Sequence, residues 1–170
     1  MKTTGIVLVV FCLALMGCPG QAQAFSQVNE LPDSISHMIA GDSSVIYISI
    51  TDTPKTLSLV TVQRDSFGQI CSLETQTWLC SPGRKGKSTP KGNFKICLKL
   101  GKAKSEKYHA MMIWWMAIDG RGIYAIHGLL GDDYLQYLGQ RASHGCIRLD
   151  PETAKSLYDR VPLGTKVFIR

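Results

Sequence analysis

Ser143-His144-Gly145-Cys146-Ile147-Arg148-Leu149 is the stretch that decides how this sequence is interpreted, because it sets a cysteine beside a histidine and between a glycine and an arginine. A second histidine, His127, lies upstream in an Ile-His-Gly segment. The reactive form of a cysteine is the thiolate, and a neighbouring imidazole or cation lowers the pKa of the thiol. We therefore interpret Cys146 as a nucleophile; the alternative is a small buried side chain without a chemical role.

Gly145 stands directly before Cys146, where a residue without a side chain permits a tight turn and lets a substrate approach the backbone closely. Backbone N–H groups at such a turn are suitable donors to the oxyanion of a tetrahedral intermediate. We expect the N–H groups of Gly145 and Cys146 to serve in this way. Ser143 is expected to hydrogen-bond within the loop, with a catalytic hydroxyl as the alternative.

Two segments, His127-Gly128 and Ser143-His144-Gly145-Cys146-Ile147-Arg148, together resemble the signature of the L,D-transpeptidase catalytic domain, also called the YkuD-like domain. Residues 88–96 are similar to the Thr-Pro-x-Gly-x-Phe-x-Ile segment of that family, and residues 122–128 and 162–169 to two of its strands. The resemblance covers residues 43–170. It implies a β-sandwich-like fold that is mostly β, with a minor helical part and one clear helix after the cysteine.

The resemblance also implies a role for each residue around the thiol. Cys146 would attack a carbonyl carbon to form a thioester, and His127 would be the general base that takes the thiol proton and later activates the acceptor. The carbonyl of Gly128 is a candidate to hold the tautomer of His127, and Gly128 is also placed with the substrate-binding residues. Arg148 either binds a substrate carboxylate or braces the loop. His144 either shapes the loop or contacts the substrate.

The substrate that the resemblance implies is a peptidoglycan tetrapeptide stem. Cleavage would release a terminal D-Ala and leave the acyl group of a diaminopimelate-type residue, at its L centre, on Cys146. An amine on a neighbouring stem would then give a 3→3 cross-link; a lipoprotein lysine, a free D-amino acid and water are the other acceptors. Water would make the protein an L,D-carboxypeptidase. Carbapenems are expected to acylate the same cysteine, and no metal or organic cofactor is implied.

Two other classes of function compete with this interpretation. A non-catalytic cell-wall-binding domain would keep the fold and lose turnover, but the intact set of Cys146, His127 and Gly145 favours an enzyme. A thiol redox protein or a zinc ribbon would be expected to carry a Cys-x-x-Cys pair, and the sequence has none.

Length and composition fit one globular domain. The chain has 170 residues, of which 45% are hydrophobic and 19% charged, enough for a sizeable core. The formal net charge of +6 suits a polyanionic cell wall. Nucleic acid is a less favoured partner, because the lysines are scattered and the N-terminus predicts export. The basic run Arg84-Lys85-Gly86-Lys87 predicts a solvated loop.

Residues 1–24 have the pattern of a secretory signal peptide: Lys2, an apolar stretch over 6–16, and Ala22-Gln23-Ala24 as a cleavage site. The apolar stretch is too short to span a bilayer comfortably. A competing interpretation is a lipobox ending at Cys18, whose lipid would tie the protein to a membrane. Both interpretations predict a mature protein in the periplasm or cell envelope of a bacterium.

Four cysteines remain in the predicted mature chain, Cys71, Cys80, Cys97 and Cys146. If Cys146 is a free thiol, the other three allow one disulfide in an oxidising compartment. Cys71 and Cys80 flank a short turn-like stretch and are the nearest pair. A bridge between them is the first pairing to consider, and the sequence leaves open which of Cys71, Cys80 and Cys97 would pair.

Apolar alternation and β-branched runs predict a domain of strands over residues 43–170, preceded by a polar lead-in over 25–42. The run Asp150-Pro151-Glu152 predicts the start of a helix that Pro162 ends. A shorter helix is expected over 132–138. The expected strands are 45–50, 56–63, 69–73, 77–80, 94–100, 111–118, 123–127 and 167–170, with 111–118 and 123–127 pairing as a hairpin.

Aromatic side chains near these segments have two interpretations each. Trp114 and Trp115 are expected to pack in the core, with one ring facing a substrate cleft as the alternative. Tyr108 and Tyr134 carry the same ambiguity.

Overall fold

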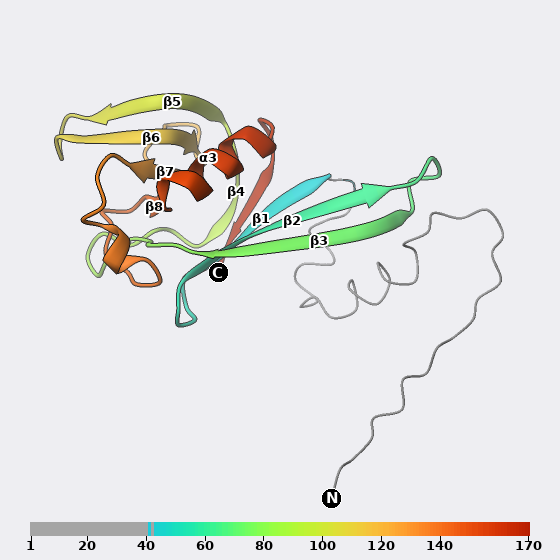
Figure 1. Cartoon of the computed structure of the whole chain (residues 1–170), viewed down its shortest axis with the longest axis horizontal. Helices are drawn as coiled ribbons and strands as arrows, with labels where there is room; N and C mark the ends of the chain where they lie inside the picture. The colour runs from blue at the N-terminus through green and yellow to red at the C-terminus, as the bar shows by residue number, and fades with distance from the viewer. Residues whose placement is uncertain (1–40, 42) are drawn as a thin grey trace, which may run out of the picture.

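The computed structural model describes residue 41 and residues 43–170 as a body of strands with one α-helix (Figure 1). The predicted signal peptide over 1–24, its Cys18, and all of the lead-in over 25–42 except Gly41 lie outside the described residues. Within the described part of the chain, no helix has the length and apolar character needed to cross a membrane.

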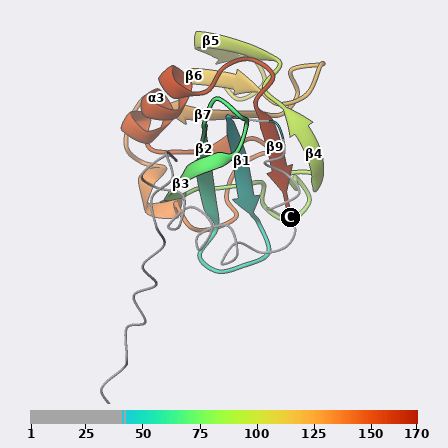
Figure 2. The same ribbon diagram turned by 90° about the vertical axis from the view of Figure 1, so that its right-hand side faces the viewer.

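Two sheets form the body of the domain (Figure 2). The five-stranded sheet has the order β3 (Ile70–Leu79), β2 (Thr56–Arg64), β1 (Ser44–Ser49), β9 (Lys166–Ile169) and β4 (Gly92–Lys95). The four-stranded sheet has the order β5 (Leu98–Ser105), β6 (Ala110–Ala117), β7 (Ala125–Leu129) and β8 (Ile147–Arg148). The pairs β1–β9 and β7–β8 are parallel, and the remaining pairs are antiparallel.

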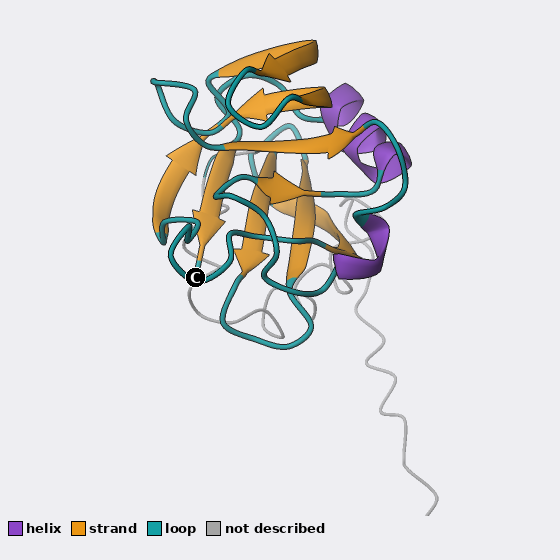
Figure 3. Cartoon of the chain, turned by 90° about the vertical axis from the view of Figure 1, so that its left-hand side faces the viewer, coloured by secondary structure: helices purple, strands orange, loops and turns teal. Residues whose placement is uncertain are grey.

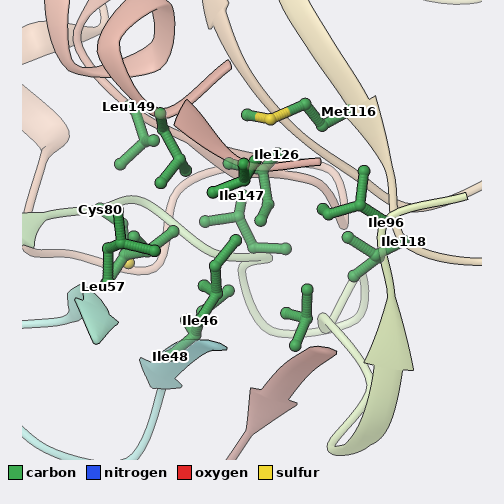
Figure 4. Close-up of a cluster of buried hydrophobic side chains, with 14 of the residues drawn as sticks. Ile46, Ile48, Leu57, Cys80, Ile96, Met116, Ile118, Ile126, Ile147 and Leu149 are labelled. Carbon is green, nitrogen blue, oxygen red and sulfur yellow. The ribbon is translucent and has the colours of Figure 1, made fainter. Parts of the chain in front are cut away.

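One core fills the space between the two sheets (Figure 4). Side chains alternate along a strand, so Ile46 and Ile48 of β1 enter this core while Val45 belongs to a second cluster. Met116, Ile126 and other buried side chains of the second sheet meet them there. The predicted sandwich-like, mostly β fold is thus confirmed, and Cys146, directly before β8, packs against a small cluster of Trp115, Ala117 and Ala125.

The strand expected over 94–100 is in fact divided between the two sheets. Its first half, β4, pairs with β9, and its second half, β5, pairs with β6. The change of partner falls between two neighbours: Ile96 N–H donates to Thr165 O at 2.9 Å, and Cys97 N–H donates to Ala117 O at 2.8 Å. The chain therefore crosses from one sheet to the other inside a single apolar run.

The two strands expected over 69–73 and 77–80 are one strand, β3, which pairs with β2 from Ile70 to Leu79. The bridge considered between Cys71 and Cys80 is absent, because the four described cysteines are free thiols. The extended conformation of the strand explains why. Nine residues of extended chain separate the two Cα atoms by about 30 Å, whereas a disulfide needs about 4–7 Å.

The predicted helix after the cysteine is confirmed as α3 (Pro151–Arg160), seen beside the strands in Figure 3. Asp150 caps it, because its Oδ1 accepts the N–H of Thr153 at 2.9 Å. The buried face of α3 packs against β6 and β7. The other expected helix is only a 3₁₀ turn over Leu135–Tyr137, next to Tyr134, whose hydroxyl donates to Leu149 O.

Candidate active site

A cleft of about 460 Å³ opens beside β7 and β8 and gathers most of the residues that the sequence singled out. Cys146, His127, His144, Ser143 and Arg148 all line it. The remaining lining residues come from the β5–β6 hairpin, from the turn after β6 and from the end of β7: Ala103, Lys104, Ser105, Lys107, Tyr108, Ala110, Met112, Trp115, Gly122, Ile123 and Leu129.

The backbone around Cys146 is held by a segment that lies far away in the sequence. Ser81 and Arg148 exchange two backbone hydrogen bonds, at 2.9 and 3.0 Å, and Arg84 N–H donates to Ser143 O at 3.0 Å. The segment 81–90 is therefore more than a solvated connection, although its basic run over 84–87 is exposed as predicted. Its first residues are buried and form the floor under the cysteine loop.

Ser143 ties the cysteine loop together internally. Its hydroxyl donates to the carbonyl of Cys146, and its Oγ accepts the N–H of Gly145 at 3.1 Å. Local bonding by Ser143 is thus confirmed. The N–H of Gly145, which we expect to serve as an oxyanion donor, is directed to Ser143 in this structure.

Gly145 occupies a backbone conformation that a side chain would disturb. Its φ is +129°, and a Cβ there would lie 3.2 Å from Cε1 of Tyr124. The carbonyl of Gly145 accepts from the buried hydroxyl of Thr89 at 2.7 Å. Thr89 belongs to the segment 88–96 noted in the sequence, but only the fold reveals its contact with this loop.

His127 is buried, with 3% of its surface exposed, on the cleft side of β7. Its Nδ1 lies 2.9 Å from the carbonyl oxygen of Gly128. A carbonyl only accepts, so Nδ1 carries the proton and Nε2 keeps its lone pair. Burial lowers the pKa of His127 to about 4, and the charge of Arg148 adds to this, while the bond to Gly128 opposes it. The imidazole is therefore neutral at pH 7 and able to accept a proton at Nε2.

Gly128 contributes its carbonyl rather than a contact with the cleft. A Cβ at Gly128 would lie 3.2 Å from Cα of Pro151 and 3.3 Å from Cβ of Ala154. Its Cα therefore faces α3, and the absent side chain lets the helix pack closely on β7. The predicted hold on the tautomer of His127 is confirmed, whereas Gly128 is not among the residues that line the cleft.

The thiol of Cys146 is protonated in this environment. Its Sγ–H donates to the carbonyl of Ile123 at 3.7 Å. Burial raises the thiol pKa above its ordinary value of 9.0 and the charge of Asp119 adds to this, while the N–H of Ala125 and the charge of Arg148 oppose it. The pair formed by Cys146 and His127 is therefore neutral at rest, with the proton on sulfur.

A β-bulge in β6 lies directly opposite His127. Ile113 pairs with Gly128 and Met116 with Ile126, so Trp114 and Trp115 together stand opposite one residue. Trp114 takes the left-handed conformation, with φ of +53°. The bulge sends Trp115 into the cleft and leaves Trp114 against Tyr158 of α3, with 5.6 Å between ring centroids. Trp114 thus packs against the core, as expected, and Trp115 faces the cleft, which was the alternative.

His144 forms part of the cleft wall that faces the β5–β6 hairpin. Its ring stacks on Tyr108 with 4.2 Å between centroids and 22° between planes. Burial lowers the pKa of His144, and four cations add to this effect: Arg84, Arg148, Lys87 and Lys107. His144 is thus a neutral side chain in a positively charged rim.

The chain belongs to the L,D-transpeptidase family. The sequence model of this family, the L,D-transpeptidase catalytic domain, matches residues 45–169. That span contains every residue of the cleft described above.

Individual relatives agree with this assignment. YciB of Bacillus subtilis (strain 168) is 34% identical to this chain over 93 residues, which are half of this chain and 48% of YciB. An L,D-transpeptidase from Mycobacterium tuberculosis H37Rv superposes with a TM-score of 0.60 at 23% identity, over 76% of this chain and 58% of that one. The structure of LdtMt1 in complex with imipenem superposes with a TM-score of 0.58 at 21% identity, over 76% of this chain and 60% of that one. The chain thus spans about half to three fifths of these relatives, and the solved structures support the fold.

Proposed function

We propose that this protein is a peptidoglycan L,D-transpeptidase in which Cys146 is the nucleophile and His127 the general base. The observation that carries the proposal is the state of His127: a buried neutral imidazole with its Nδ1 proton directed to Gly128 and its Nε2 available, in the same cleft as Cys146. A histidine with only a packing role would not be expected to share a cleft with a thiol.

The neutral pair determines how the thiol reacts. The pKa of the thiol lies above that of the imidazole, so a standing thiolate is disfavoured and the proton moves to Nε2 as sulfur attacks the carbonyl carbon. The tetrahedral oxyanion is stabilised by backbone donors, with the N–H of Cys146 favoured over that of Gly145, which Ser143 engages. Collapse expels the amine of D-Ala, which receives the proton from His127 and leaves a thioester.

The substrate and the location follow from family and charge. The acyl donor is a tetrapeptide stem of peptidoglycan, and the acceptor is an amine of a second stem or of a lipoprotein. Work on the cell wall requires export, which the leader over 1–24 provides, by cleavage after Ala24 or by lipidation at Cys18. An L,D-carboxypeptidase would use the same acyl-enzyme and differ only in the acceptor.

Mass spectrometry of the chain mixed with disaccharide-tetrapeptide tests the proposal. A cross-linked dimer with loss of D-Ala, absent with Cys146→Ala, is the expected result. Tripeptide monomer alone identifies a carboxypeptidase. If neither a product nor a covalent adduct with a carbapenem forms, the protein is a wall-binding domain and the proposal is wrong. Thermal unfolding of Cys146→Ala is the control, because that variant must remain folded for its inactivity to be informative.

A further inference from the structure

A second pocket, of about 580 Å³, lies next to the catalytic cleft and shares Arg148 with it. Two more arginines line this pocket, Arg84 and Arg141, together with the phenol rings of Tyr134 and Tyr137. Three guanidinium groups thus surround a space that begins where the cleft ends.

The positive charge of this pocket is not balanced by the residues around it. Among the described residues, neither Arg84 nor Arg148 forms an ion pair with a carboxylate. Asp133 lies on the lining and is exposed, without an ion pair to any of the three arginines. Arg141 uses its Nε–H on the carbonyl of Gly83 at 2.9 Å, which fixes its guanidinium at the pocket wall.

The pocket lies on the histidine side of the cleft. Arg148 of β8 is the register partner of His127 in β7, and Leu149 N–H donates to His127 O at 3.0 Å. Residues paired across parallel strands point to the same face of a sheet, and both of these line the cleft. A molecule held by Arg148 and Arg84 is therefore next to the base that must deprotonate an incoming amine.

We propose that the pocket formed by Arg84, Arg141 and Arg148 is a carboxylate subsite for the acyl acceptor. It selects acceptors that carry a free carboxylate near the attacking amine, as an amino acid or a diamino acid does. The inference rests on the proposed function, since it describes the second half of that reaction.

Guanidinium groups match a carboxylate with two parallel N–H donors, and a half-buried arginine makes such a bond stronger than a solvated one does. With the carboxylate anchored, the amine nitrogen bonds to the thioester carbon while the C–S bond breaks. The proton lost by the amine passes through His127 to the sulfur and restores the thiol. A carboxamide in place of the carboxylate would bring uncompensated N–H donors against the three cations.

The test compares D-alanine with D-alaninamide as acceptors for the full chain acylated by a tetrapeptide stem. We expect D-alanine to have the lower KM, and Arg84→Gln to raise that KM about ten-fold. This rise should exceed any change in the rate of acyl-enzyme formation. The backbone N–H of Arg84, which holds Ser143, is kept in this variant. Lys85→Gln is the matched control: this adjacent exposed cation does not line the pocket, and the KM should not change.

Equal use of the two acceptors, or an unchanged KM in Arg84→Gln, overturns the inference while the proposed function stands. Competition by inorganic phosphate without discrimination between acid and amide also overturns it and identifies a general anion pocket. Absence of any acyl-enzyme refutes the proposed function instead. In that case, NMR titration of the full chain with the two probes still decides whether Arg84 binds a carboxylate, and equal binding refutes the subsite.

Discussion

Thr89 and Gly145 lie 56 positions apart in the chain and are joined by one hydrogen bond, from the threonine hydroxyl to the glycine carbonyl, at 2.7 Å. The same Oγ1 accepts the N–H of Gly83 at 2.8 Å. One buried hydroxyl therefore connects the 81–90 segment to the residue directly before Cys146.

Replacing Thr89 by valine should destabilise the protein and slow the chemistry together. The substitution keeps the shape of the side chain but leaves the N–H of Gly83 and the carbonyl of Gly145 without their partner. We expect a loss of about 1–3 kcal/mol in the free energy of unfolding, measured by urea titration. We also expect slower acylation by imipenem. Thr89→Ser retains the hydroxyl, and a loss as large as that of valine in this control would contradict the explanation.

A methyl group at Gly145 should be more damaging than one at another glycine with positive φ. Gly145→Ala brings a Cβ to 3.2 Å from the ring of Tyr124, whereas Gly131, with φ of +87°, has nothing within 4 Å. Gly131→Ala should therefore cost only the backbone strain, about 1 kcal/mol. Gly145→Ala should cost more and abolish most acylation. Equal unfolding free energies for the two variants would refute the steric argument.

Alkylation of Cys146 should be slow at neutral pH. Burial and Asp119 raise the thiol pKa above 9.0, so the thiolate is scarce at pH 7. The rate with iodoacetamide should still be rising with pH at pH 9, when followed by mass spectrometry. Asp119→Asn removes one cause and should move the profile to lower pH. A plateau already reached near pH 7 would mean a pre-formed thiolate and would change the proposed proton transfer.

Acid should weaken the fold through His127. Its folded pKa of about 4 lies below the value of 6.5 for a free imidazole, so the unfolded chain binds the proton first. The free energy of unfolding is therefore fully present above pH 6.5 and falls by about 3 kcal/mol as the pH drops to 4.

The contribution of His127 is isolated by comparing variants at two pH values. His127→Asn should lose less stability than the wild type between pH 7 and pH 4.5 in urea titrations. His109→Asn, at an exposed position, should follow the wild-type slope. The same slope in all three proteins would show that the buried imidazole does not govern the acid response.

Tyr108 should influence His144 through their stacked rings. Tyr108→Ser removes the ring, exposes the imidazole and relieves the burial that lowers its pKa, so the pKa of His144 should rise. Loss of the aromatic pair should also reduce the free energy of unfolding by about 1 kcal/mol. NMR titration gives the pKa, and Tyr108→Phe, which keeps the stack, should match the wild type. A falling pKa in Tyr108→Ser would contradict this explanation.

Features with a local cause could be predicted from the sequence. The helix at Asp150-Pro151 appears where its cap and first turn predict it, and the hairpin of β6 and β7 forms around the turn after Ile118. Cys146 and His127 share one cleft, as their motif indicates. Each of these depends on residues close in sequence or on a family signature.

Features that depend on distant partners could not be predicted. The crossover at Ile96 and Cys97 is invisible in a continuous apolar run, because it is decided by where Thr165 and Ala117 lie. The bridge considered between Cys71 and Cys80 is absent because closeness in sequence means distance along an extended strand. The bulge at Trp114 likewise needs the register of β7 to be known.

That bulge makes the length of β6 matter more than its composition. It adds one step to the alternation of the strand, so that Met112 and Trp115, an odd number of residues apart, both face the cleft with His127. Inserting a single residue between Met112 and Trp115 would send Trp115 to the core face and Met116 to the cleft. In the exposed turn at 106–109, an insertion that leaves Tyr108 against His144 has no such phase to keep and should be accepted. The protein can therefore be lengthened at the tip of its hairpin, but not in the strand that faces its base.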